Sequence, residues 1–155
     1  MAKLPHLSNM ENCCYFITTT TENRSQLFGL EQNAAILWNT IRTQRDRRRF
    51  HLLGFVIMPD HLHLLILPTG QTEVPFIMQE IKKSSARLIN MAGSRTGRLW
   101  MDEYYDYVIR NEKDLMEKLR SVHNNPVKKG LAENEEDYPF SSANPIYNEF
   151  LFREF

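Results

Sequence analysis

The sequence is poor in cysteine and has no long apolar run, and both absences exclude classes of protein. Its two cysteines are adjacent, at Cys13 and Cys14, so a disulfide framework is not expected, and a CxxC metal motif is absent. No apolar stretch approaches the roughly 18 residues needed to span a bilayer, and residues 1–6 lack the apolar segment of a secretory signal. We therefore expect a protein that does not enter the membrane and works in the reducing cytoplasm.

The sequence also has no net charge: its 19 lysines and arginines balance its 19 aspartates and glutamates, so the formal net charge is zero. The charges are nevertheless segregated along the chain. One basic stretch holds Arg42, Arg45, Arg47, Arg48 and Arg49, a second holds Lys82, Lys83, Arg87, Arg95 and Arg98, and the C-terminal part is acidic. A charge run usually marks a solvated face. Two basic stretches in one small domain are nevertheless compatible with a polyanionic binding partner.

The chain has the size and composition of one globular domain over residues 1–155, with 42% hydrophobic and 25% charged residues and no internal repeat. Its apolar periodicity predicts strands at 13–21, 51–58, 61–67 and 104–109, a helix that starts at 31 and ends in the first basic stretch, and helices at 74–91 and 112–124. Pro59 and Asp60 form the tight turn of a hairpin, and Pro126 is expected to end the last helix. This order predicts an α+β fold, a ferredoxin-like (RRM-like) antiparallel sheet with helices packed mainly on one face.

The sharpest chemical feature is His61-Leu62-His63 at the start of a predicted strand. Residues two apart on a strand point to the same face, so both imidazoles project together. Two imidazole nitrogens can share one divalent cation. An H-x-H pair alone is a weak signal, but its position directly after a turn places it at an open end of the sheet. A glycine-rich phosphate loop, a Ser-His-Asp order and a paired-carboxylate motif are missing.

Four blocks of sequence resemble the single-tyrosine HUH transposases, and within them the REP-associated branch. The blocks are MPDHLHLLI at 58–66, Trp100 with YYDYVIRNE at 104–112, HNNPVKKGL at 123–131 and DYPFSS at 137–142. They stand in the family's order and spacing, and the resemblance covers about residues 10–143. Residues 144–155 are expected to form an irregular tail.

The resemblance implies a specific chemistry on single-stranded or hairpin DNA. In such proteins a bound divalent metal, Mg²⁺ or Mn²⁺, polarises the scissile phosphate, and a helical tyrosine attacks it to give a 5′-phosphotyrosine link. Carried onto this sequence, the metal ligands are His61, His63 and Asn125. The resemblance further implies a cytoplasmic, nucleoid-associated protein that acts as a monomer or homodimer.

The sequence departs from this pattern at the nucleophile. Counting one helical turn back from Asn125 gives Ser121, where the family carries its tyrosine. A serine hydroxyl is far less acidic than a phenol and its side chain is much shorter. Three accounts remain open: covalent catalysis is lost while DNA and metal binding persist, Ser121 attacks inefficiently, or a tyrosine of the neighbouring strand substitutes. The candidates for substitution are Tyr104, Tyr105 and Tyr107, with Tyr105 retained as the site candidate.

The second basic stretch supplies the expected DNA contacts. Lys82, Lys83 and Arg87 lie on one predicted helix and Arg98 on the loop after it. Two further functions stay open: a non-enzymatic binder or regulator derived from a transposase, which recognises a hairpin without cutting it, and an RNA-binding module with a similar sheet. The sequence has no aromatic-rich motif of the RRM type to support the RNA-binding alternative.

Overall fold

The protein builds one four-stranded antiparallel sheet in the order β2-β3-β1-β4. The computed structural model describes residues 13–153. The strands are β1 Tyr15–Thr20, β2 Phe50–Met58, β3 His61–Pro68 and β4 Tyr105–Val108. The long helices are α1 Glu31–Asp46, α2 Val74–Ala92 and α3 Glu112–Lys128. The predicted α+β sheet fold is confirmed.

The β2–β3 hairpin forms the apolar half of the sheet. Its two strands pair from Phe50 with Pro68 to Met58 with His61, so Pro59 and Asp60 make a two-residue turn. Both strands are buried on both faces, which explains why their sequences are continuous apolar runs rather than alternating ones. The hairpin turn places His61 at the extreme end of β3.

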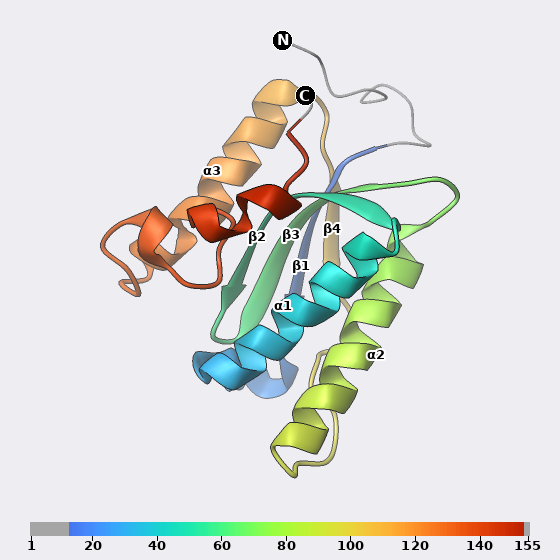
Figure 1. The fold of residues 1–155 in the computed structure, drawn as a ribbon, viewed down its shortest axis with the longest axis vertical. Coiled ribbons are helices and arrows are strands. Elements are labelled where there is room, and N and C mark those ends of the chain that lie inside the picture. Colours follow the sequence, from blue (N-terminus) through green and yellow to red (C-terminus); the bar gives the residue numbers. More distant parts are fainter. Residues whose placement is uncertain (1–12, 154–155) are drawn as a thin grey trace.

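Helices cover both faces of the sheet, two on one side and one on the other (Figure 1). The larger core packs α1 and α2 against one face through residues such as Leu37, Ile77 and Phe55. The second core packs α3 against the opposite face through Leu115 and Val122. The helices therefore lie mainly on one face, as predicted, and α3 is the exception.

Helix α3 does not end where the sequence predicts. Its N-cap is Asn111, whose side-chain oxygen accepts from the backbone N–H of Asp114 at 2.8 Å. The helix then continues through Pro126 to Lys128. Proline removes one helical hydrogen bond, but here it falls in the final turn, and its own carbonyl accepts from Leu131 at 2.8 Å. Burial of Pro126 stabilises this ending.

The C-terminal segment differs from the irregular tail that the sequence predicts. Residues Pro145–Phe150 form a 3₁₀ helix, and its Tyr147 is buried in the larger core. The chain then runs along the outer edge of β2, where the Phe152 N–H donates to the Leu52 carbonyl at 2.7 Å. This segment covers part of an edge strand that would otherwise expose unpaired backbone groups.

Candidate functional site

The two histidines of β3 lie on the α3 side of the sheet. In the strand register His63 stands opposite Thr18 of β1, and Thr18 in turn stands opposite Tyr105 of β4. Residues directly opposite in an antiparallel pair share a face. Phe16 belongs to the α3-side core and its ring stacks on His63 with centroids 5.3 Å apart, which fixes the face. His61 and His63 are neighbours there, with ring centroids 4.7 Å apart.

His61 is oriented by the residue before it. Its Nδ1 lies 2.6 Å from Asp60 Oδ1, and since a carboxylate only accepts, Nδ1 is the donor. Burial alone would raise the pKa of the Asp60 carboxyl, but the His61 hydrogen bond and the positive charges of His61 and Arg24 hold it below its ordinary value. In the neutral form of the ring, this contact leaves the lone pair on Nε2. It faces Asn125 of α3, with Nε2 and Asn125 Nδ2 3.5 Å apart.

His63 is held neutral by its surroundings. Burial, with a smaller contribution from the charge of His61, lowers its pKa from 6.5 to about 4. Its Nδ1 lies 2.8 Å from the hydroxyl of Thr18. If Nδ1 carries the proton and donates to Thr18, Nε2 is available as a ligand, as it is in His61. A neutral imidazole is the protonation state that binds a metal.

The residues fit a divalent metal site of mixed nitrogen and oxygen ligands. Within residues 13–153 no three His, Cys, Asp or Glu side chains cluster closely enough to hold an ion, so a third protein ligand at this place would come from another type of group. Asn125 is in position to supply one, because the oxygen and nitrogen of an amide exchange places on a half-turn. Two imidazoles and one oxygen leave positions open for phosphate oxygens and are compatible with Mn²⁺ or Mg²⁺.

Ser121 lies on the helix stripe that faces this site. The stripe runs Asp114, Lys118, Ser121 and Asn125, at spacings of four and three residues. In the first half of the stripe, the Lys118 ammonium lies 4.4 Å from the ring centroid of Tyr107. At the end of the stripe, Asn125 Nδ2 lies 3.5 Å from His61 Nε2. Ser121 is exposed between these two anchored positions. A longer side chain at position 121 would therefore extend over the open part of the sheet beside His63.

The three tyrosines near β4 have different environments. Tyr107 donates its hydroxyl to Asp114 Oδ2 at 3.0 Å and lies beneath Lys118. Tyr104 packs against the larger core on the opposite face. Tyr105 is 57% exposed, in the same row as Thr18 and His63. Tyr105 is thus the phenol with both an accessible hydroxyl and a place on the histidine face.

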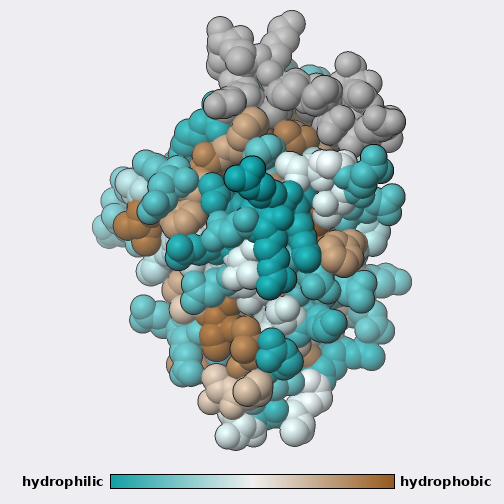
Figure 2. All heavy atoms as spheres, turned by 45° about the vertical axis from the view of Figure 1, so that its right-hand side comes forward, coloured by the Kyte–Doolittle hydropathy of each residue, from teal (hydrophilic) through white to brown (hydrophobic). Residues whose placement is uncertain are grey.

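The four predicted DNA-binding cations are not equally available. The Lys82 ammonium donates to the carbonyls of Met101 and Asp102 at 2.6 and 3.1 Å, and burial lowers its pKa. Arg98 pairs with Asp102 at 3.0 Å and with Glu22 at 3.6 Å. Lys83 and Arg87 are exposed on the outer surface of α2. Figure 2 shows the α2 side of the molecule, where most of the visible surface is hydrophilic. Lys82 and Arg98 therefore hold the loop before β4, whereas Lys83 and Arg87 face solvent.

His123 and Trp100, which belong to the blocks that carry the family resemblance, have structural contacts. The His123 ring points to the C-terminal segment, where Nε2 lies 2.7 Å from the Ser142 hydroxyl, rather than to the histidine pair. Trp100 is buried and donates to Ser85 at 3.0 Å, so it packs in the core instead of presenting a face to a base.

The sequence reasoning missed the two residues that orient the histidines. Asp60 was interpreted only as part of a turn, although an acidic residue directly before a histidine pair is a usable signal. Thr18 could not be found from local sequence, because its partner is 45 positions away and is fixed by strand register.

The chain is similar to known transposases in sequence. Residues 9–125 match the family described as "Transposase IS200 like". A REP-associated tyrosine transposase of Escherichia coli (strain K12) is 28% identical over 83% of this chain and 74% of the relative. A protein described as a putative REP-associated tyrosine transposase of Haemophilus influenzae is 26% identical over 83% of this chain and 78% of the relative.

Solved structures give the same result for the fold. The structure of a REP-associated tyrosine transposase bound to a REP hairpin superposes with a TM-score of 0.74 at 26% identity, covering 94% of this chain and 86% of that one. A protein described as a putative transposase, from Deinococcus radiodurans R1, shares the fold with a TM-score of 0.55 at 24% identity. The matched region covers 73% of this chain and 90% of the Deinococcus chain.

Proposed function

The chain belongs to the IS200-like transposase family, and from this premise we propose that it binds hairpin or single-stranded DNA at the His61–His63 face with a divalent metal. The observation that supports the proposal is the position of the His61 ring, whose centroid lies 4.7 Å from that of His63 and whose Nε2 lies 3.5 Å from Asn125 Nδ2 of α3. The related protein solved with a REP hairpin supports DNA hairpins as the ligand. The protein acts in the cytoplasm beside chromosomal DNA, as a monomer or a homodimer.

Each residue has a defined task in this proposal. A divalent ion, Mg²⁺ or Mn²⁺, would supply Lewis acidity to a phosphate of the bound strand. His61 and His63 would each present an imidazole nitrogen, and Asn125 would present an amide oxygen. Asp60 and Thr18 fix the orientation of the two rings through 2.6 and 2.8 Å contacts. The exposed Lys83 and Arg87 of α2 hold phosphates of the stem.

We propose that covalent strand cleavage is lost because position 121 has no phenol. Ser121 lies on the site-facing stripe of α3. The helix position that carries the nucleophile in the family is therefore retained, but the serine side chain is too short to extend to the metal ligands. The protein then recognises a hairpin without joining it covalently, as a DNA binder or regulator of transposase ancestry.

The environment of Tyr105 favours a second candidate, a working transposase. Tyr105 is exposed and stands opposite Thr18, the residue that contacts His63. It is two strand spacings, or about 10 Å, from His63 along the sheet. A phosphate held between them would lie within reach of its hydroxyl, and strand cleavage would then depend on Tyr105 rather than on position 121.

Hairpin binding with and without metal tests the proposal. We expect wild-type protein to bind a labelled hairpin more tightly with Mn²⁺ than with EDTA. We expect His61→Ala and His63→Ala to remove this metal-dependent gain. The matched control is His51→Ala, because His51 lies at the far end of β2. This variant should keep the gain in binding that Mn²⁺ gives. Equal binding with Mn²⁺ and EDTA by wild type would contradict the metal site.

A further inference from the structure

Helices α1 and α2 lie side by side on one face of the sheet (Figure 1), and a groove of about 600 Å³ runs between them. The proposed metal site is on the opposite face and does not use this groove. Two apolar side chains of the groove are open to solvent, because Leu88 is 38% and Met91 69% exposed. Figure 2 shows apolar side chains gathered in the lower half of this otherwise hydrophilic side. Open apolar surface with a polar rim commonly marks an interaction site.

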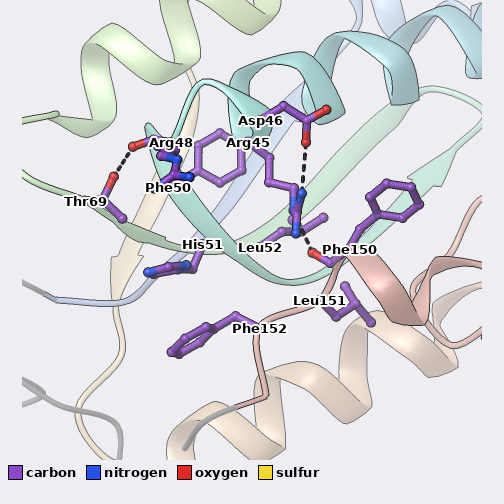
Figure 3. A pocket seen from close by; sticks show the side chains of 10 residues that line it. All are labelled: Arg45, Asp46, Arg48, Phe50, His51, Leu52, Thr69, Phe150, Leu151 and Phe152. Carbon is purple, nitrogen blue, oxygen red and sulfur yellow. Dashed lines mark hydrogen bonds and ion pairs between the residues drawn. The ribbon is translucent and has the colours of Figure 1, made fainter.

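Positive charge reaches the groove from both helices. The connection from α1 to β2 carries an arginine cluster whose members are Arg42, Arg45, Arg47, Arg48 and Arg49. Figure 3 shows Arg45 turned toward Asp46 and the Phe150 carbonyl, which accepts from Arg45 Nε at 2.9 Å. Arg47 instead lines the groove together with Arg87 of α2. Both are exposed, and in the part of the chain that the structure describes no carboxylate pairs with either. The groove therefore combines open apolar surface with two positive charges that lack a carboxylate.

A surface of the opposite character follows α3 on the same chain. We call residues 131–137 the acidic segment. It begins with Leu131, which is 46% exposed. Its four carboxylates are all exposed, at Glu133, Glu135, Glu136 and Asp137. Within residues 13–153 no cationic side chain pairs with any of the four. The acidic segment thus offers one open apolar side chain beside unpaired negative charge, which complements the groove.

The acidic segment cannot fill the groove of its own copy. It follows α3, which packs on the face of the sheet opposite to α1 and α2. In Figure 1 the chain after α3 lies at the left and α2 at the right. Both ends of the segment are held there, since the Leu131 N–H donates to the Pro126 carbonyl and the Tyr138 hydroxyl to the Ile57 carbonyl, each at 2.8 Å. Only the segment of another copy can therefore reach the groove.

We propose that the acidic segment of a second copy of this chain docks in the groove between α1 and α2. Leu131 of the second copy packs on Leu88 and Met91, and its carboxylates pair with Arg47 and Arg87. The contact is heterologous, because each copy uses its groove toward one neighbour and its acidic segment toward another. It goes beyond the proposed function and needs no DNA.

The size of the contact sets its strength. A short segment buries less than the roughly 1,200 Å² of a stable interface. We therefore expect weak association with a Kd of about 100 μM at low salt. Because exposed charges are screened, association should weaken markedly between about 0.05 M and about 0.5 M NaCl.

A charge swap between two variants tests the proposal. Sedimentation velocity of nuclease-treated, DNA-free protein measures the average mass over a range of concentrations that spans about 100 μM. The mass of wild type should rise with concentration at low salt. Arg47→Glu/Arg87→Glu reverses the charge of the groove, and Glu135→Arg/Glu136→Arg reverses that of the acidic segment. Each variant alone should associate at least about fivefold more weakly than wild type, because like charges then face each other.

An equimolar mixture of the two variants gives the decisive result. In the mixture the acidic groove of one variant meets the basic segment of the other, so association should return toward that of wild type. The control is Arg42→Glu/Lys113→Glu, which changes the net charge as much as the groove variant but lies outside both surfaces. This control should associate like wild type.

Four results would overturn the proposal. They are a wild type that stays monomeric over the whole range, a groove variant that associates like wild type, a mixture that associates no better than its components, and a control that loses association as fully as the groove variant. Association that appears only when DNA is added would assign the groove to nucleic acid and would also overturn it. Hairpin binding is measured separately, so failure here leaves the proposed function standing.

Discussion

At the scale of single residues, the histidine pair depends on side chains that do not touch a phosphate. Asp60 accepts a hydrogen bond from Nδ1 of His61, and the Thr18 hydroxyl contacts Nδ1 of His63. Partners of this kind fix the tautomer and ring orientation of a metal-binding histidine. With both Nδ1 atoms protonated, the two Nε2 atoms are the acceptor ends of the rings.

Removing the Asp60 carboxylate should weaken metal binding without removing a ligand. We expect Asp60→Asn to reduce Mn²⁺ affinity about 10- to 100-fold, because His61 loses the charge that fixes its tautomer. Calorimetric titration with Mn²⁺ measures the change, and Glu149→Gln on the remote 3₁₀ helix is the control. An affinity equal to that of wild type would show that Asp60 only shapes the turn.

His123 should make stability depend on pH. Burial, with a smaller contribution from the charge of Arg153, lowers its pKa from 6.5 to about 4 in the folded protein. The unfolded chain therefore binds the proton more readily, so stability is full above pH 6.5 and falls as pH drops toward 4. The loss from this group is up to about 3 kcal/mol. Urea unfolding of His123→Gln between pH 7 and 4.5 should show a shallower decline than wild type, and an identical decline contradicts this assignment.

At the scale of elements, α3 brings the site together. It carries Ser121 and Asn125 across the sheet, and its position is set at both ends. Asn111 caps the start, and the packing of Pro126 sets the end. The buried Asp114 accepts from Tyr107 at 3.0 Å and so ties the first turn to β4.

The N-cap of α3 should contribute measurably to stability. We expect Asn111→Ala to lower the free energy of unfolding by about 1 kcal/mol, because the Asp114 N–H loses its acceptor. Equilibrium urea unfolding measures the difference. Asn111→Ser, which also accepts a hydrogen bond, should recover most of it. A serine variant as unstable as the alanine one would assign the effect to something other than capping.

The elements could be predicted from the sequence more completely than the contacts between them. Strands β2 and β3 followed from their apolar runs and the Pro59-Asp60 turn, because these signals are local. The extension of α3 past Pro126 to Lys128 was missed. The free-energy cost of a proline depends on its position within the helix, and the sequence alone does not show that Pro126 falls in the last turn. The pairing of Thr18 with His63 depends on strand register, which local periodicity does not contain.

At the scale of the whole molecule, zero net charge conceals two basic surfaces, which meet at a groove that both Arg47 and Arg87 line. One is the outer face of α2 with Lys83 and Arg87, and the other is the arginine cluster at the start of β2. In residues 13–153 no helix is long and apolar enough to cross a membrane. Charge patches of this kind act on polyanions through phosphate contacts.

The α2 surface should contribute to hairpin binding through charge alone. We expect Lys83→Ala/Arg87→Ala to weaken binding to hairpins of different sequence by similar factors and to lower the salt slope by about two. Fluorescence anisotropy at several salt concentrations measures the slope, and Lys113→Ala on α3 is the control. A slope equal to that of wild type would remove α2 from the DNA-binding surface.

The central claim is that the site keeps its metal ligands and its helix position but lacks the phenol at position 121. The most direct measurement incubates hairpin DNA with Mn²⁺ and either wild type or Ser121→Tyr, followed by denaturing gel analysis. Tyrosine costs only a few tenths of a kcal/mol relative to serine in a helix, so the variant should fold. We predict a covalent protein–DNA adduct and strand cleavage for Ser121→Tyr, and binding without an adduct for wild type. A wild-type adduct that survives Ser121→Ala but is lost in Tyr105→Phe would contradict the account and identify Tyr105 as the nucleophile of an active transposase.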